Sequence, residues 1–252
     1  MSRSSGGEGD AVRALRLGMD LGMRLIDTAE VYAHGHSEEV VAEAVGQDRE
    51  TVFIASKVSA ENLSYENVLR SCESSLRRLK TPYIDLYQVH WPNTRIPIQE
   101  TMRAMEKLVA DGKVRYVGVS NFSKKQTREA QEALSKNDLA ANQVEYSLDQ
   151  RSIELELLPF CTAEHVTVIA YTPLGRGRIV GRGRNGGGKA LDEIASKYAK
   201  TRAQVALNWL ITKETVVTIP KAVNLEHVKE NAGAAGWKLS PEDQEALNDA
   251  FS

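Results

Sequence analysis

Short apolar runs alternate along the chain with segments in which apolar residues recur every three or four positions. The runs cover residues 24–27, 52–57, 84–90, 114–119, 140–144, 166–170 and 216–219. Continuous apolar runs of this length are typical of parallel strands that are buried on both faces. Helical spacing covers residues 11–21, 37–45, 64–79, 97–112, 190–199 and 201–211, with shorter segments after residues 123, 152, 224 and 240. Seven strands, nearly all followed by a helix, predict an α/β fold of the (β/α) barrel type.

Several helix starts carry recognisable caps. Ser123 with Gln126 and Thr201 with Gln204 have the spacing of capping boxes, in which each side chain bonds the backbone of the other. Ser37 is the expected N-cap of the helix over residues 37–45. A loop rich in glycine and arginine is expected over residues 175–188.

Three early strands each end in one ionisable side chain: Asp27, Lys57 and His90. In a parallel barrel the carboxyl ends of the strands share one rim, and that rim holds the active site. We therefore expect the three groups to meet there. Taken singly, each has an ordinary interpretation, as a buried hydrogen-bonding residue, a solvated strand end and a turn histidine, and only their joint occurrence favours catalysis.

Composition limits the classes of function. The 252 residues are 42% hydrophobic and carry a formal net charge of -2, so no general attraction for nucleic acid or anionic membranes is expected. No apolar run approaches the roughly 20 residues of a membrane span. Cys72 and Cys161 have no metal-like spacing, and we expect no metal site and a cytoplasmic location. Residues 1–10, rich in Gly and Ser, are expected to be disordered, and residues 11–252 to form a single domain.

Six motifs together resemble the aldo-keto reductase family over most of the chain, in the manner of a short prokaryotic or archaeal member. They occupy residues 25–32, 56–57, 85–92, 118–122, 142–146 and 219–221, and they stand in order at the predicted strand ends. Each motif is weak alone, and the set is specific. The resemblance implies a (β/α)8 TIM-type barrel and NADPH-linked reduction of aldehydes and ketones. Its catalytic tetrad falls on Asp27, Tyr32, Lys57 and His90.

Carbonyl reduction explains why these residue types belong together. A proton must reach the oxygen while hydride reaches the carbon, and a tyrosine with an ordinary pKa near 10 is a poor acid at neutral pH. A neighbouring ammonium lowers that pKa, and a carboxylate holds the ammonium in place. Tyr32 is thus the expected acid, with Lys57 and Asp27 as its partners. His90 would orient the carbonyl, and Trp91 would wall the substrate pocket or simply pack in the core.

The resemblance also assigns a cofactor site. It places Ser120, Asn121 and Gln143 on the nicotinamide carboxamide and Tyr171 against the ring. Pyrophosphate would be covered by Thr172, Pro173, Leu174, Gly175 and Arg176, and the adenosine 2'-phosphate and adenine would be held by Lys221, His227, Glu230 and Asn231. Without the resemblance, these residues read equally well as rim, turn and loop groups.

The chain departs from the family pattern at three places. Ala222 stands where the family usually has Ser, and His227 stands where it usually has Arg. Loss of the arginine removes a permanently charged guanidinium fork, which predicts weaker discrimination between NADPH and NADH. The usual first barrel strand is missing or atypical, so the strand over residues 24–27 is expected to have an open edge. A shortened chain, a strand supplied by another chain and an inactive fold are the open explanations. The chain also stops soon after its last helix, which predicts a shallow, permissive substrate site.

Two rival functions remain at this stage. One is a barrel enzyme that forms a Schiff base on Lys57, which requires a depressed lysine pKa. The other is a regulatory or inactive reductase-like protein that binds the cofactor without turnover. Small carbonyl compounds are the expected partners of the leading interpretation, in a monomer or weak homo-oligomer.

Overall fold

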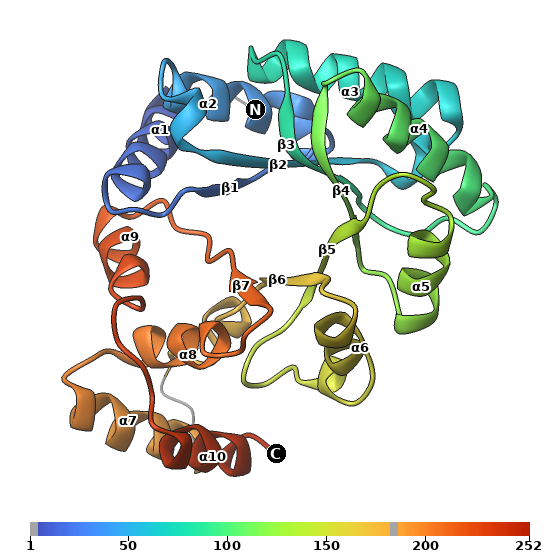
Figure 1. Cartoon of the computed structure of the whole chain (residues 1–252). Helices are drawn as coiled ribbons and strands as arrows, with labels where there is room; N and C mark the ends of the chain where they lie inside the picture. The colour runs from blue at the N-terminus through green and yellow to red at the C-terminus, as the bar shows by residue number, and fades with distance from the viewer. Residues whose placement is uncertain (1–4, 182–185) are drawn as a thin grey trace. The chain divides into compact units, whose positions relative to one another are not determined.

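The structure, a computed structural model, describes residues 5–181 and 186–252. Its strands are β1 (Leu25–Asp27), β2 (Phe53–Val58), β3 (Ile84–Val89), β4 (Val114–Ser120), β5 (Leu139–Glu145), β6 (Thr167–Tyr171) and β7 (Val216–Thr218). Its α-helices are α1 (Ser5–Asp20), α2 (His36–Val45), α3 (Tyr65–Leu79), α4 (Ile98–Ala110), α5 (Lys124–Glu132), α6 (Leu157–Ala163), α7 (Gly186–Tyr198), α8 (Arg202–Ile211), α9 (Leu225–Ala232) and α10 (Pro241–Ala250). Each predicted strand is present (Figure 1).

The chain divides into two compact units, residues 1–143 and 144–252. In the first unit the strands pair in parallel in chain order, from β1 to β5. Helices α1 to α4 lie along the outer side of these strands (Figure 1). In the second unit β6 pairs in parallel with β7. The expectation of a single domain over residues 11–252 stays a prediction.

Each unit has its own apolar core. In the first, Val68, Cys72, Leu76 and Leu79 form one buried stripe of α3, which belongs to the same apolar core as the fully buried strand β3. Their three- and four-residue spacing is the amphipathic pattern read from the sequence. In the second unit, Trp209 of α8 is the largest fully buried side chain.

The close packing of the strands depends on one glycine at the middle of β4. A Cβ at Gly118 would lie 3.0 Å from side-chain atoms of Gln88 and Leu86 and 3.2 Å from the carbonyl oxygen of Ala141. Glycine therefore lets β3, β4 and β5 approach one another behind the rim.

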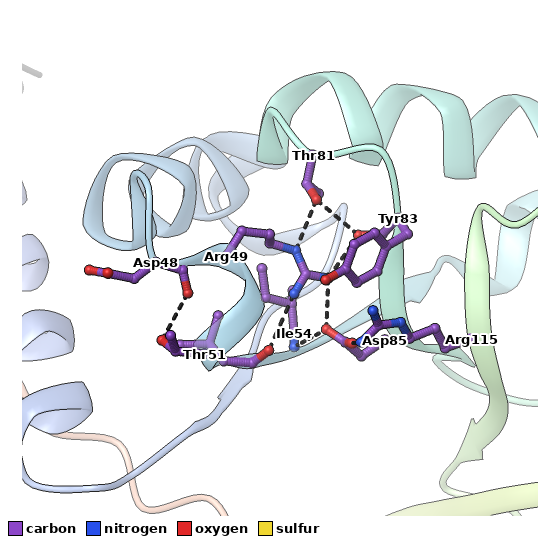
Figure 2. Close-up of polar contacts among 9 residues, drawn as sticks. Asp48, Arg49, Thr51, Ile54, Thr81, Tyr83, Asp85 and Arg115 are labelled. Carbon is purple, nitrogen blue, oxygen red and sulfur yellow. Dashed lines mark hydrogen bonds and ion pairs between the residues drawn. The ribbon is translucent and has the colours of Figure 1, made fainter.

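The opposite end of the strands is held by a buried carboxylate. Asp85, at the start of β3, accepts hydrogen bonds from Arg49 (2.7 Å), Arg115 (2.8 Å) and the backbone N–H of Ile54 (2.9 Å) (Figure 2). Because a buried carboxylate is costly unless it is paired, this cluster fixes the start of β3 against its neighbours.

The N-terminal prediction requires a correction. Helix α1 begins at Ser5, so residues 5–10 are helical where disorder was expected, and residues 1–4 lie outside the described part. The cap of α2 also differs, because its N-cap is Gly35 and Ser37 already lies inside the helix. In the loop expected over residues 175–188, a 3₁₀ turn, η5 (Gly175–Gly177), precedes residues 182–185, which lie outside the described residues.

Candidate active site

The carboxyl ends of β1 and β2 bring Asp27 and Lys57 together. Lys57 is fully buried, and its Nζ donates hydrogen bonds to both carboxylate oxygens of Asp27, at 2.7 and 2.6 Å. A third bond, of 2.9 Å, goes to the backbone oxygen of Thr28. An ammonium has three protons to donate, so this set of acceptors suits a charged lysine.

Tyr32 and His90 complete the cluster. Tyr32 opens the 3₁₀ turn η1 (Tyr32–Gly35), is 38% exposed, and has its ring centroid 5.1 Å from the Nζ of Lys57. The His90 ring follows β3 and meets the Tyr32 ring edge-on, with centroids 5.5 Å apart. The structure thus brings together the four side chains that the sequence selected.

The environment sets the charge of two of these groups. Burial lowers the pKa of Lys57, and the adjacent Asp27 carboxylate opposes that effect. Burial, together with the positive charge of Lys57, lowers the pKa of His90 to about 4. His90 is therefore a neutral imidazole at neutral pH, able to donate one hydrogen bond without carrying charge.

Ser120, Asn121 and Gln143 form a second polar cluster at the ends of β4 and β5. The Ser120 hydroxyl donates to the backbone oxygen of Gln143 (2.9 Å), and the Asn121 amide donates to the backbone oxygen of His90 (3.0 Å). The Gln143 amide donates to Asp27 (2.7 Å). This last bond was not foreseen, and it ties the predicted carboxamide site directly to the predicted proton-donor site.

The remaining predicted cofactor residues lie in the second unit. Tyr171 ends β6, and burial raises the pKa of its phenol. In the segment that follows, Thr172, Gly175 and Arg176 have left-handed backbone angles, with φ of 52°, 58° and 57°, while Pro173 is buried and Leu174 partly so. Left-handed residues turn successive backbone N–H groups toward one side, which is a common anion-binding arrangement.

The adenosine-binding candidates lie just before α9 and along it. Lys221 and His227 are exposed, Glu230 is half-buried, and Asn231 is buried. Asn224 caps α9, since its side chain accepts from the backbone N–H of Glu226 at 2.8 Å. The positive end of a helix and an exposed lysine are chemically suited to a phosphate.

Two apolar side chains near the predicted proton donor are exposed. Trp91 is 52% exposed, and Val31, which precedes Tyr32, is 46% exposed. Core packing therefore does not account for Trp91, and a wall position fits its exposure. Val31 was missed because a single apolar residue beside a turn carries no periodic signal.

Glu38 is a further site residue that the sequence analysis passed over. It is fully buried on α2 and accepts a hydrogen bond of 2.6 Å from Ser56, the residue before Lys57. A signal was present: Glu38 stands three and seven residues before Val41 and Val45, and so shares their inward helix face.

In the part of the chain that the structure describes, no group of three His, Cys, Asp or Glu side chains could hold a metal ion. Over the same residues, no helix is both long and apolar enough to cross a membrane.

Comparison with known proteins gives one consistent answer. The model of the Aldo/keto reductase family matches residues 7–251. Methylglyoxal reductase YeaE of Escherichia coli is 44% identical over 95% of this chain and 84% of that protein, and glyoxal reductase of Bacillus subtilis is 35% identical over 95% and 83%. A crystal structure of an aldo/keto reductase from Klebsiella pneumoniae, in complex with NADP and acetate, matches this structure with a TM-score of 0.91. The two sequences are 41% identical, and the match covers 100% of this chain and 88% of that one.

The chain therefore belongs to the aldo/keto reductase family. The predicted (β/α)8 fold class and the predicted class of enzyme, an oxidoreductase that reduces carbonyl groups, are confirmed by these relatives. Among the described residues, the strand order of the first unit starts at β1, in agreement with the expected atypical first strand.

Proposed function

We propose that this protein reduces small aldehydes and ketones with NADPH, and that short dicarbonyl compounds such as methylglyoxal are among its substrates. The printed activities of the E. coli and B. subtilis relatives support this substrate class. So does the exposed position of Trp91 and Val31, which suits a shallow site for a small molecule. The observation that carries the proposal is the buried Lys57–Asp27 pair beside the Tyr32 ring.

The chain's own groups supply the proton side of the reaction. Tyr32 gives its phenolic proton to the carbonyl oxygen, and the positive charge of Lys57 stabilises the phenolate that remains. Asp27 holds Lys57 charged against the effect of burial. Neutral His90 donates a hydrogen bond that orients the carbonyl. When bound, the reduced nicotinamide supplies the hydride.

The residues present fit that cofactor. The hydroxyl of Ser120 and the amides of Asn121 and Gln143 offer the mixture of donors and acceptors that a carboxamide requires. Within the second unit, Tyr171 would pack against the ring and Lys221 would face the 2'-phosphate. Residues 172–176, three of which have left-handed backbone angles, would face the pyrophosphate. NADP in the related K. pneumoniae structure supports the choice of cofactor.

A single substitution tests the role of the phenol. Tyr32→Phe should lower the turnover of methylglyoxal by about a hundredfold or more, because the loss of a general acid typically costs that much. NADPH binding, followed by fluorescence, should be unchanged because the cofactor contacts are intact. Tyr65→Phe, on α3, is the matched control and should keep wild-type turnover. Near-normal turnover in Tyr32→Phe would remove the proposed mechanism.

The rival functions predict different results. A Schiff base needs a free amine, whereas the three hydrogen bonds of Lys57 to oxygen acceptors favour the ammonium. Borohydride trapping of substrate on Lys57 would nevertheless support that rival. Tight NADPH binding without turnover on a broad aldehyde panel would support a regulatory protein.

Free, buried Cys72 and Cys161 agree with the proposed cytoplasmic location, and we propose a monomer or weak homo-oligomer.

A further inference from the structure

Glu38 is a carboxyl side chain in the interior of the first unit to which the reaction proposed above assigns no role. Its side chain is fully buried. One carboxylate oxygen accepts a hydrogen bond from Ser56 at 2.6 Å. The other accepts a hydrogen bond from Nε of Arg78 at 2.7 Å and lies 2.6 Å from its Nη2 in an ion pair. A buried carboxylate paired with a guanidinium has a fixed position, because moving it would leave a charge unpaired.

These contacts lead to both partners of the proton-donor pair. Ser56 directly precedes Lys57 on β2. Arg78 of α3 packs on Gly35, the last residue of the η1 turn that begins with Tyr32. The packing is tight, since a Cβ built on Gly35 would lie 2.6 Å from Nε of Arg78.

The turn that carries Tyr32 has a backbone that needs such support. Ala33, His34 and Gly35 have φ angles of 48°, 55° and 89° in succession. Left-handed angles are unfavourable for residues with a Cβ, and a run of them persists only where surrounding contacts determine it. The Arg78 side chain, which is held in place by Glu38, packs against Gly35 and supports this turn from the side of α3.

Glu38 also acts on Lys57 through its charge. Its carboxylate raises the pKa of Lys57, in the same direction as Asp27 and against the effect of burial. Loss of that negative charge would therefore lower the pH at which Lys57 gives up its proton.

We propose that Glu38 and Arg78 form a clamp that holds the Tyr32 turn and the Lys57 end of β2 in one arrangement, so that Glu38 is a positioning residue for the proton donor. The inference rests on the proposed roles of Tyr32 and Lys57. It assigns Glu38 no contact with substrate or cofactor. Its effect should therefore appear in turnover and not in binding.

The structure offers a matched control at the other end of the same strands. Asp85 is likewise a buried carboxylate paired with an arginine, Arg49, but it lies at the start of β3 (Figure 2). Glu38→Gln and Asp85→Asn each remove one buried charge with little change of shape. Both variants should lose stability in urea unfolding, so stability alone does not separate a positioning role from a structural one.

Kinetics should separate the two variants. In Glu38→Gln we expect kcat for methylglyoxal to fall about tenfold or more, because small misplacements of reacting groups are costly, while KM and NADPH fluorescence quenching stay within about twofold. The alkaline limb of kcat/KM should move to lower pH, since Lys57 loses a neighbour that favours its charged form. Asp85→Asn should show neither change.

The outcomes that would overturn the clamp are specific. Equal kcat and equal pH profiles for Glu38→Gln and Asp85→Asn, in a protein whose Tyr32→Phe variant is inactive, would show that Glu38 is structural only. If Glu38→Gln does not fold, Ser56→Ala decides: it removes one bond of the clamp and leaves the ion pair, and wild-type kcat in that variant would refute the proposal. An active Tyr32→Phe would count against the proposed function itself.

Discussion

At the scale of the residue, Lys57 shows that neighbouring residues decide whether a lysine at a strand end is solvated or buried. Alone, a lysine at a strand end is usually a solvated charge, yet here the side chain is fully buried with three hydrogen bonds. A buried ammonium is tolerated only with such partners. The sequence selected Lys57 because of Asp27, Tyr32 and His90 at neighbouring strand ends, and the hydrogen bonds supply the physical reason that it can be there.

His227 gives a second prediction at this scale, because we expect cofactor selectivity to depend on it. This residue is exposed on α9, where the family resemblance places an arginine. We expect the unaltered protein to prefer NADPH over NADH by less than a thousandfold in kcat/KM. His227→Arg should raise that preference about tenfold, the value of roughly 1.4 kcal/mol that one charged contact can supply.

The control for this prediction is His165→Arg, which adds the same group at an exposed turn of the second unit. It should leave the NADPH/NADH ratio unchanged. An NADPH preference above a thousandfold in the unaltered protein would contradict the proposed role of His227. Equal NADPH/NADH ratios in the two arginine variants would contradict it as well.

At the scale of the element, the caps divide into predictable and unpredictable cases. The capping boxes of Ser123 with Gln126 and Thr201 with Gln204 are both present, because each depends on residues three apart in one segment. The prediction for Ser37 was wrong. Its hydroxyl accepts from Thr28 at 3.2 Å instead, and α2 starts earlier on Gly35. The Ser37 hydroxyl is thus bound by a residue of the preceding turn region rather than by the backbone of its own helix.

The η1 turn gives an element-scale prediction. Gly35 and Gly22 have nearly equal φ angles, 89° and 88°, but only Gly35 is packed, against Arg78. Gly22→Ala should cost about 1–2 kcal/mol in the free energy of unfolding, the penalty of a left-handed residue with a Cβ. Gly35→Ala should cost about 1–3 kcal/mol more, since the added methyl group overlaps Arg78.

Urea unfolding of both variants measures the difference. Because the Gly35 turn carries Tyr32, Gly35→Ala should also lower kcat, and Gly22→Ala should not. Equal unfolding free energies for the two variants would mean that the contact between Gly35 and Arg78 adds no constraint.

At the scale of the whole molecule, each of the two compact units has its own core, and Trp209 is the largest side chain in the second. Its ring contacts Lys213, with Nζ 3.4 Å from a ring centroid, and its N–H donates to Asn248 at 3.0 Å. Trp209→Ala should lower the free energy of unfolding by about 3–5 kcal/mol, through lost burial and the cavity left behind.

Trp91→Ala is the control, because the 52% exposed side chain of Trp91 leaves no enclosed cavity. It should change stability by about 1 kcal/mol or less. Circular dichroism during denaturant unfolding reports both values. A similar decrease in the free energy of unfolding for the two variants would show that side-chain exposure does not govern the loss of stability at these positions.

The chain itself determined the order of strands and helices, the barrel class and the three ionisable side chains Asp27, Lys57 and His90 at strand ends. Local apolar periodicity and residues at strand ends express these features directly, and parallel pairing then brings the strand ends to one rim. The proposed role of Tyr32 as their fourth partner came from the family motifs. Tertiary structure alone decided the bond from Gln143 to Asp27 and the pairing of the Glu38 carboxylate with Ser56 and Arg78. Those features depend on partners 18 to 116 residues away in the chain, whose approach no local pattern encodes.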